Sequence, residues 1–483
     1  MMSYGQQGEL EALLAAGFGG LTLNLLREQL PHLGLRLDRA AAEMRAFAGD
    51  NAVDGLIRET AGDAFNSALL AMMRERQSDG SDRLGEDHRM LKRSFRTFAE
   101  REVKPMAEKF HREDLLIPDE LIRRVAELGC FGLSIPQEYG GFQERPDNLG
   151  MVVVTEELSR GALIFGSLIT RPEILSKALL VGGTEAQKRR WLPKLASGEN
   201  MVGVAVTEPD FGSDVASMGV TAGPVEGGWL INGTKTWSTF SGRAELLALL
   251  ARTESDPALG HRGLSLFVVE KPAYDGHAFE HVNPRGGVLR GRAIATLGYR
   301  GMHSFELNFD DYFVPAENLI GEAQGRGKGF YLQMEGFSGG RMQTAGRALG
   351  VMQAAFELAR DYAASRKVFG KALGDYPLTR EKLARMAVTV QGCRQMAYAA
   401  ARLLDDGRGK LEASMVKFLA CRQAEWITRE AQQLHGGMGY AEEFPVSRLF
   451  LDARVLSIFE GTEEILALRV IMPAVLKDVL DAA

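Results

Sequence analysis

A long run of regularly spaced small and apolar residues lies in the last third of the chain. After Arg341, such residues recur in alternating steps of four and three, at positions 345, 349, 352, 356, 359 and 363. This spacing puts them on one face of a long, buried α-helix. Two further helical patterns follow at about 378–406 and 411–434, joined by short links. Long helices with short connections pack as antiparallel neighbours, so the sequence predicts a four-helix bundle over residues 324–483.

The segment before this bundle has the texture of a β domain. Apolar runs at 246–251, 264–269 and 305–309 predict strands. Asn232-Gly233 lies between two strand-like arms, which is a strong short-range signal for a β-hairpin. We therefore expect residues 202–323 to form a small all-β domain, either a barrel or a sandwich.

The first part of the chain is again helical. Within residues 85–201, one expected helix runs from Pro118 to Gly129, and Thr184 with Gln187 forms a capping box that begins another. Residues 1–84 predict a helical extension that ends in a polar linker. The expected fold is thus α+β and multidomain, with a helical extension, a helical domain, a β domain and a helical bundle. A chain of 483 residues is too long for one hydrophobic core, which agrees with this division.

Composition and charge exclude several classes of function. A net charge of −6 argues against a nucleic-acid partner, which needs a positive surface. No run of about 18 apolar residues is present, so no membrane span is expected. The three cysteines, Cys130, Cys393 and Cys421, are far apart and have no metal-ligand spacing, so we expect no metal site and a reducing compartment. The N-terminus resembles neither a signal nor a transit peptide, so the expected location is cytoplasmic.

One carboxylate near the end of the chain is a candidate catalytic base. Glu460 follows Ile458 and Phe459 and precedes Gly461 and Thr462. At the end of an apolar run water is scarce, and a desolvated carboxyl group has a raised pKa that makes it a usable base. The alternative is an ordinary helix N-terminus that Thr462 caps. These residues alone leave both interpretations open.

Four other segments have residues that can bind a flat ring or a phosphate. They are a loop at 205–214 with free backbone N–H groups, Trp237 beside two hydroxyl side chains, Arg366 before a glycine, and the glycines of 436–439. The structural alternatives are a plain turn, a strand core residue, a cation at a helix C-terminus and a helix cap. No GxGxxG motif follows a strand, which argues against a Rossmann domain.

Taken together and in this order, these segments resemble the acyl-CoA dehydrogenase family over about residues 85–480. Seven short motifs carry the resemblance: Val206-Thr-Glu-Pro with Gly212-Ser-Asp214, Asn232-Gly-x-Lys-x-Trp237, Phe309-Asp-Asp-Tyr-Phe-Val-Pro315, Gly339-Gly-Arg341, Arg366-Lys-x-Phe-Gly370, Gln433-x-x-Gly-Gly437 and Phe459-Glu-Gly-Thr462. Each motif is weak alone, but seven in register are specific.

The resemblance implies a FAD enzyme that oxidises an acyl-CoA thioester to its 2-enoyl form. By position Glu460 corresponds to the base that removes the proton next to the thioester. The resemblance places Ser213 and Arg341 near the substrate. It also implies these FAD contacts: Val206, Thr207, Ser213, Trp237, Thr239, Arg366, Phe369, Gln433, Gly436, Gly437, Thr462 and Glu464.

The same resemblance has consequences for partners. Some of the FAD contacts, including Arg366 and Gln433, come from a neighbouring subunit in the family, which implies a homodimer or homotetramer. Electron-transferring flavoprotein is the expected electron acceptor. Three alternatives stay open: an oxidase on the same scaffold, a non-catalytic DNA-associated member of the fold, and a purely structural helical protein.

The acyl group is expected to be short, branched and dicarboxylic. The N-terminal extension together with segments 298–306 and 437–446 is similar to family members with such substrates, although another short or branched acyl-CoA is the alternative. A second carboxylate needs a cation or strong donors in the pocket. We expect Arg171 to hold it, helped by Thr170 or His303. The alternative is a surface arginine that precedes a proline.

Overall fold

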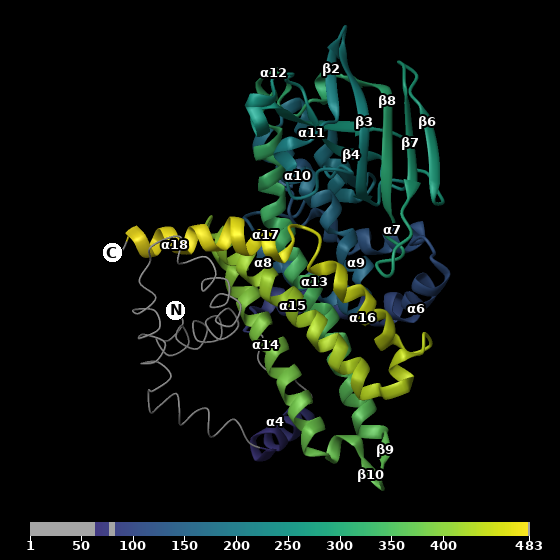
Figure 1. Ribbon diagram of the computed structural model, residues 1–483, viewed down its shortest axis with the longest axis vertical. Coiled ribbons are helices and arrows are strands. Elements are labelled where there is room, and N and C mark those ends of the chain that lie inside the picture. The colour runs from purple at the N-terminus through teal and green to yellow at the C-terminus, as the bar shows by residue number, and fades with distance from the viewer. Residues whose placement is uncertain (1–62, 77–82, 482–483) are drawn as a thin grey trace.

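The computed structural model describes residues 63–76 and 83–481 (Figure 1). Most of the predicted extension lies outside these residues. Its described part is helix α4 (Asp63–Arg76), which packs against α14 (Pro377–Asp405) of the C-terminal region. The Asp63 carboxylate accepts hydrogen bonds from Arg380 Nε and Nη2 at 2.8 and 2.5 Å. Helix α4 is therefore attached to the C-terminal helices.

A helical domain follows and is built around one buried helix. Helix α8 (Asn148–Gly161) has its apolar residues buried on every side. Helices α5 (Glu86–Phe98), α9 (Leu163–Leu168), α13 (Gly329–Ser365) and α14 pack around it. The capping box predicted at Thr184 is present, because its hydroxyl accepts from Gln187 N and the Gln187 side chain accepts from Thr184 N. The helices of this domain are α5 (Glu86–Phe98), α6 (Lys104–Glu113), α7 (Asp119–Glu127), α8 (Asn148–Gly161), α9 (Leu163–Leu168), α10 (Thr170–Gly182) and α11 (Glu185–Ser197).

The middle of the chain forms one sheet of eight strands. The strand order is β1-β4-β2-β3-β8-β7-β6, and β5, which is not part of this order, pairs with β4. The strands are β1 (Val202–Ala205), β2 (Thr221–Val225), β3 (Gly228–Thr239), β4 (Leu246–Arg252), β5 (Leu264–Glu270), β6 (Ala278–Val282), β7 (Val288–Ala293) and β8 (Ser304–Pro315). In Figure 1 this sheet lies above the helices α7 and α9, with its edge strand β6 on the outside.

The predicted hairpin at Asn232-Gly233 is wrong. Strand β3 runs unbroken through both residues, and the tight turn to β2 lies at Gly227, whose φ is +74°. The Asn232 amide instead exchanges two hydrogen bonds with Asp311 on β8, at 2.8 and 2.9 Å. The pairing of β3 with β8 shifts register at this point. The dipeptide therefore marks a bulge inside a strand, where a glycine is equally suited to the strained backbone.

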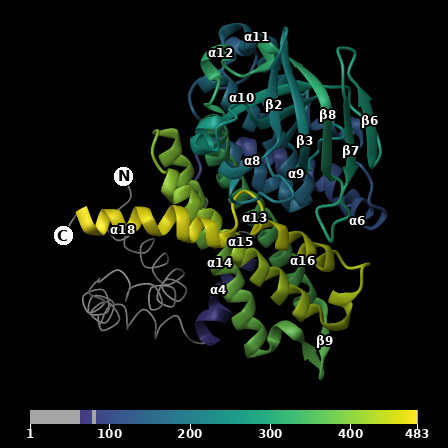
Figure 2. The ribbon, with the colours of Figure 1, turned by 45° about the horizontal axis from the view of Figure 1, so that its top comes forward.

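The C-terminal region is the predicted bundle, and one helix links it to the rest of the molecule. Helix α13 (Gly329–Ser365) packs on α8 and α10 of the helical domain, on α14 and α15 (Lys410–His435), and on strand β5. All six residues of its predicted apolar face are at most 1% exposed. Figures 1 and 2 show the sheet beside one end of α13, and the small hairpin β9–β10 at the other.

The remaining elements of this region are short or close the bundle. They are α12 (Glu322–Gly325), β9 (Lys367–Val368), β10 (Lys371–Ala372), α16 (Pro445–Leu456), α17 (Glu463–Ile465) and α18 (Met472–Asp481). None of the helices within 63–76 and 83–481 has the length and apolarity to cross a lipid bilayer.

Glycines let α13 and α8 approach closely. A Cβ atom at Gly350 would lie 2.3 Å from the carbonyl oxygen of Glu156 on α8, so a larger residue does not fit without a shift of backbone. The Glu156 side chain joins α8 to α14, because its carboxylate accepts from Arg394 Nε at 2.8 Å and from the Tyr398 hydroxyl at 2.7 Å. Arg394 also donates through Nη2 to Gln353 on α13 at 2.8 Å, which links all three helices. The long helix thus holds fixed positions in both helical regions, and it carries part of the site described next.

Candidate active site

Glu460 lies in the turn between α16 and α17 with its side chain turned inward. The side chain is 8% exposed, and its Oε1 atom is 3.6 Å from Arg171 Nη2. Its other oxygen, Oε2, is buried and has no hydrogen-bond partner among the described residues. The backbone is left-handed here, with φ of +57°, which a residue other than glycine keeps only where its surroundings impose it.

Contacts with α15 hold this turn in place. The Lys417 ammonium donates to the carbonyl oxygen of Gly461 at 2.6 Å, and the Ser457 hydroxyl bonds the Glu425 carboxylate. Thr462 is the cap predicted for α17, since its hydroxyl accepts from Ile465 N at 3.3 Å. The helix-terminus interpretation and the buried carboxylate are therefore both correct, because the cap at Thr462 helps to hold the turn that carries Glu460 two residues earlier.

The long helix approaches the carboxylate through a glycine. A Cβ atom at Gly340 would lie 3.1 Å from Glu460 Oε2, so a side chain at this position would occupy space beside the unpaired oxygen. The glycine keeps one face of the carboxylate free of other side chains. A proton acceptor needs such a free oxygen within reach of its substrate.

Four cations lie around Glu460, and we call Arg171, Arg341, Arg347 and Lys417 the cationic cluster. Arg341 is half-buried and the other three are buried. Burial lowers the pKa of Arg341, Arg347 and Lys417, and the Glu460 carboxylate acts in the opposite direction on each of them. The cluster carries more positive charge than the single carboxylate balances. Buried charges need partners, so this arrangement favours an anionic ligand.

Each guanidinium group of the cationic cluster has an N–H donor without a hydrogen-bond acceptor among residues 63–76 and 83–481. The Nε atoms of Arg171, Arg341 and Arg347 are buried and have no hydrogen-bond partner in the described part of the chain. Arg347 is held by Ser167 and Thr344 hydroxyls, at 3.2 and 2.5 Å, and its guanidinium stacks 4.7 Å from the Phe459 ring. An N–H left without an acceptor inside a protein is costly, which again indicates a polar ligand.

A buried ion pair fixes the loop that was predicted to contact FAD. The Lys235 ammonium, on β3, donates to the carbonyl oxygen of Val206 at 2.9 Å and to Glu208 at 2.7 Å. The Glu208 carboxylate also accepts from the backbone N–H groups of Gly219 and Val220. Burial lowers the pKa of Lys235 to about 8, although Glu208 acts to raise it. Both ends of the loop between β1 and β2 are thereby pinned to the sheet.

Replacing Lys235 by methionine is expected to destabilise the protein and loosen the loop that was predicted to contact FAD. The substitution leaves the buried Glu208 carboxylate without its cation, and breaking such a pair costs about 3–5 kcal/mol. Urea unfolding and flavin release during gel filtration would measure the two effects. The double variant Glu208→Gln/Lys235→Met removes both charges and should recover part of the loss. Unchanged stability in Lys235→Met would contradict this role.

The other FAD candidates on the sheet lie near this loop. Thr207 accepts a hydrogen bond from Thr236 N at 2.8 Å, and the Thr239 hydroxyl bonds Ser304 at 2.9 Å. Trp237 was expected either in the strand core or against a ring. Its indole is 55% exposed, on a left-handed backbone with φ of +54°, so the core alternative is wrong. Ser213 is exposed on the pinned loop.

The two candidates on the β9–β10 hairpin of the C-terminal region lie apart from those on the sheet. Phe369 is 98% exposed at the tip between β9 and β10, and Arg366 beside it is exposed as well. Figure 1 shows this hairpin at the opposite end of the molecule from the sheet. Gly436 and Gly437 are exposed, with no atom within 4 Å of a Cβ built on either, and Gln433 and Glu464 also face outward. A single chain does not bring the β9–β10 hairpin to the sheet that carries Trp237.

His303 is not part of the group around Glu460. Its Nε2 atom lies 3.1 Å from Asp114, and its ring is 4.4 Å from that of His277. Burial lowers the pKa of His303, against the raising effect of Asp114. The Thr170 hydroxyl bonds the Gly166 carbonyl at 3.4 Å. The side chains expected to assist Arg171 thus have other partners.

Sequence reasoning missed Arg347, Lys417 and Gly340. Arg347 and Lys417 are single cations inside helical runs of small or apolar residues. A cation that interrupts a buried face could have been interpreted as part of a binding site. Gly340 lies within a quoted motif, but its nearness to Glu460 depends on how α13 crosses the α16–α17 turn.

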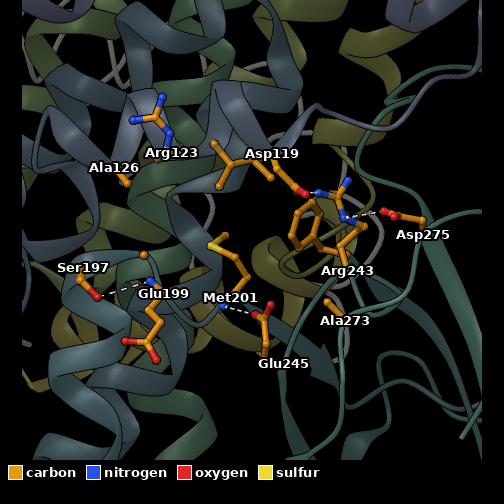
Figure 3. Close-up of a pocket in the computed structure, with 13 residues that line it drawn as sticks. Asp119, Arg123, Ala126, Ser197, Glu199, Met201, Arg243, Glu245, Ala273 and Asp275 are labelled. Carbon is orange, nitrogen blue, oxygen red and sulfur yellow. Dashed lines mark hydrogen bonds and ion pairs between the residues drawn. The ribbon is translucent and has the colours of Figure 1, made fainter.

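A separate cavity of about 570 Å³ lies between α7, the end of α11 and the sheet (Figure 3). Arg243 crosses its rim and pairs with Asp119 and Asp275, and Glu245 accepts from Met201 N at 2.7 Å. None of the predicted site residues lines this cavity. It is therefore distinct from the group around Glu460.

Comparison with known proteins identifies the family. Three family models match, described as Acyl-CoA dehydrogenase, N-terminal domain (residues 85–199), middle domain (203–312) and C-terminal domain (327–475). Together they span more than half of the chain. The chain belongs to the acyl-CoA dehydrogenase family. This confirms the predicted α+β multidomain fold, the oxidoreductase activity on CH–CH groups and the acyl-CoA substrate.

Individual members of the acyl-CoA dehydrogenase family are similar over most of their length. (2S)-Methylsuccinyl-CoA dehydrogenase of Cereibacter sphaeroides is 43% identical over 469 residues, which are 96% of this chain and 84% of that protein. A structure of glutaryl-coenzyme A dehydrogenase with glutaryl-CoA has a TM-score of 0.75 at 32% identity, covering 82% of this chain and 96% of the other. Glutaryl-CoA dehydrogenase from Mycobacterium smegmatis with FADH2 has a TM-score of 0.70 at 28% identity, covering 81% and 95%.

Acyl-CoA dehydrogenases depend on FAD, which confirms the predicted cofactor. The residues present here fit that group. The exposed Trp237 indole offers a face for a ring, the pinned loop offers backbone donors, and the open glycines Gly436 and Gly437 leave room for close approach.

Proposed function

We propose that this acyl-CoA dehydrogenase oxidises (2S)-methylsuccinyl-CoA to mesaconyl-CoA. The observation that carries the proposal is the buried Glu460 carboxylate with one free oxygen inside the cationic cluster. The match to a methylsuccinyl-CoA dehydrogenase supports the same substrate. It covers 96% of the chain and so includes most of residues 1–84, the extension that the sequence analysis associates with such substrates.

In this proposal Glu460 is the base. Its free Oε2 accepts the proton from the carbon next to the thioester, and Gly340 leaves the space through which that carbon approaches. FAD supplies the hydride acceptor for the neighbouring carbon. Loss of the proton and the hydride removes two hydrogens and two electrons from the substrate. A double bond forms between the two carbons, and the product is the 2-enoyl thioester. Arg171, at 3.6 Å, stabilises the carboxylate before it takes the proton.

Arg171 also has the distal carboxylate of the substrate as its proposed partner. Its Nε atom is unpaired and buried, and the side chain projects from α10 into the group around Glu460. The alternative of a surface arginine does not fit a side chain that is 6% exposed. Arg347 is a better assistant than Thr170 or His303, since its own Nε is unpaired and its charge repels that of Arg171, a repulsion that a carboxylate held between the two would relieve. Arg341 is assigned to the CoA portion.

The FAD contacts are proposed to come from two copies of the chain. One copy supplies the sheet residues Val206, Thr207, Ser213, Trp237 and Thr239, with Thr462 and Glu464 near the diphosphate and adenosine. The other supplies Arg366, Phe369, Gln433, Gly436 and Gly437. The exposure of Phe369 and its distance from the sheet support a homodimer or homotetramer.

Electron-transferring flavoprotein as acceptor follows from the family resemblance. The three free, buried cysteines support the cytoplasmic location.

A titration of the enzyme-bound flavin under anaerobic conditions tests the substrate. Methylsuccinyl-CoA is expected to bleach the yellow absorption at a lower concentration than glutaryl-CoA or butyryl-CoA. Equal or stronger bleaching by butyryl-CoA would contradict the dicarboxylic substrate. Turnover with oxygen that outpaces turnover with electron-transferring flavoprotein would make the enzyme an oxidase.

A further inference from the structure

Three side chains that the proposed reaction does not use meet where the helical domain joins the sheet. Asp114 follows α6, His277 precedes β6 and His303 precedes β8. Asp114 lies 3.1 Å from His303 Nε2 and 4.0 Å from His277 Nδ1. One donor atom from each residue lies within 4.8 Å of the other two. The chain thus brings together two imidazoles and a carboxylate from three separate segments.

The backbone holds each of these residues independently of the others. Asp114 is the left-handed C-cap of α6, with φ of +52°, and its N–H donates to the Phe110 carbonyl. The His303 carbonyl accepts from Phe240 N at 2.8 Å, and the His277 carbonyl accepts from Ala293 N at 2.7 Å. These hydrogen bonds fix the backbone positions from which the three side chains extend.

A further cross-link ties the segments together. The Arg300 guanidinium donates to the His111 carbonyl on α6 at 3.0 Å and to the Thr296 carbonyl at 3.1 Å. It therefore joins the loop that carries His303 to the helix that precedes Asp114. The cluster does not depend on its own side chains for its assembly.

The donor set suits a transition-metal ion. Imidazole nitrogen and carboxylate oxygen are ligands that Zn²⁺ and its neighbours prefer, and three protein ligands leave room for water. His303 is 5% exposed, and its Nδ1 atom has no partner among the described residues, so the buried ring is only partly satisfied. His277 is half-exposed, which gives an ion access from solvent and lets that ring rotate toward it.

We propose that Asp114, His277 and His303 bind a divalent transition-metal ion such as Zn²⁺. The ion would be structural and would clamp the end of α6 to the strands β6 and β8. It would also stiffen the neighbourhood of the flavin, because Ser304, next to His303, bonds the hydroxyl of Thr239 at 2.9 Å. Binding to the folded state alone raises its stability.

Metal titration of the purified holoenzyme tests the site. The enzyme is treated with a chelator, dialysed and titrated with Zn²⁺ by calorimetry, and Co²⁺ serves as a spectroscopic probe of nitrogen ligands. We expect one ion per chain and a higher Tm when Zn²⁺ is present. His277→Gln is the main variant because its half-exposed side chain is not needed for folding. Its affinity is expected to fall roughly tenfold or more.

His281→Gln is the matched control. This histidine lies on β6, four residues after His277, and its Nδ1 bonds the Tyr274 hydroxyl instead of the cluster. It should bind Zn²⁺ as the wild type does. The proposal is overturned if the wild type binds neither ion at micromolar concentration, or if His277→Gln and His281→Gln bind equally well. Asp114→Asn, read by the same calorimetry, should also weaken binding, and retention of full affinity there would overturn the assignment of the third ligand.

Discussion

Glutamine in place of Glu460 is expected to stop flavin reduction while the enzyme keeps both FAD and acyl-CoA. Glutamine has the shape of glutamate but no oxygen that can take up a proton at neutral pH. General-base catalysis contributes roughly 100- to 10,000-fold, so the rate of flavin bleaching should fall by about that factor. Anaerobic stopped-flow mixing with methylsuccinyl-CoA measures this rate, and the flavin-to-protein absorbance ratio reports the bound cofactor.

Glu463→Gln supplies the control for this variant. Glu463 lies in the same turn, begins α17 and pairs with Arg422 at 3.4 Å, outside the group around Glu460. Its rate of bleaching should be that of the wild type. Bleaching at the wild-type rate in Glu460→Gln would show that another group takes the proton. Loss of FAD from Glu460→Gln would show that the residue is needed for assembly instead.

The Arg171→Ala variant is expected to lose activity unevenly between substrates. With methylsuccinyl-CoA it loses the charged hydrogen bond to the distal carboxylate, about 2–3 kcal/mol, or roughly 30- to 150-fold in kcat/KM. Butyryl-CoA has no distal carboxylate, so this hydrogen bond is absent and its loss costs nothing with that substrate. Both substrates lose an additional common factor, because Arg171 also lies 3.6 Å from Glu460. The ratio of the two losses is therefore the quantity to measure.

Arg341→Lys distinguishes recognition of the distal carboxylate from the general effect of an arginine near Glu460. Arg341 belongs to the same cationic cluster but is assigned to the CoA portion, which both substrates share. Its substitution should lower kcat/KM by a similar factor with methylsuccinyl-CoA and with butyryl-CoA. Equal losses for the two substrates in Arg171→Ala would remove the evidence that this residue holds the second carboxylate.

The helices were predictable because their signals are local. The apolar face of α13 and the capping box at Thr184 are patterns over a few turns of chain, and the structure has both. The signal at Asn232-Gly233 was also local but ambiguous, because a tight turn and a bulge need the same backbone freedom. The amide contact with Asp311, far along the chain, decided between them.

The site was predictable only as far as its motifs extended. Glu460 and Thr462 lie in one motif, so their joint role could be inferred from the sequence. The approach of Arg347 and Lys417 to Glu460 depends on how α13, α15 and the α16–α17 turn pack, which no spacing encodes. The same holds for Asp114, His277 and His303, whose separation in sequence has no metal-ligand pattern. The expectation that no metal binds was based on cysteines alone.

The turn that holds Glu460 has a consequence for how such enzymes diverge. Its conformation is set by Lys417 on α15 and by the cap at Thr462, and not by α10, which carries Arg171. Substitutions on α10 at positions other than Arg171 can therefore alter which acyl group is accepted without changing the backbone that carries the base. Chemistry and selectivity are inherited on separate pieces of the chain, so a lineage can exchange one substrate for another and keep its reaction throughout.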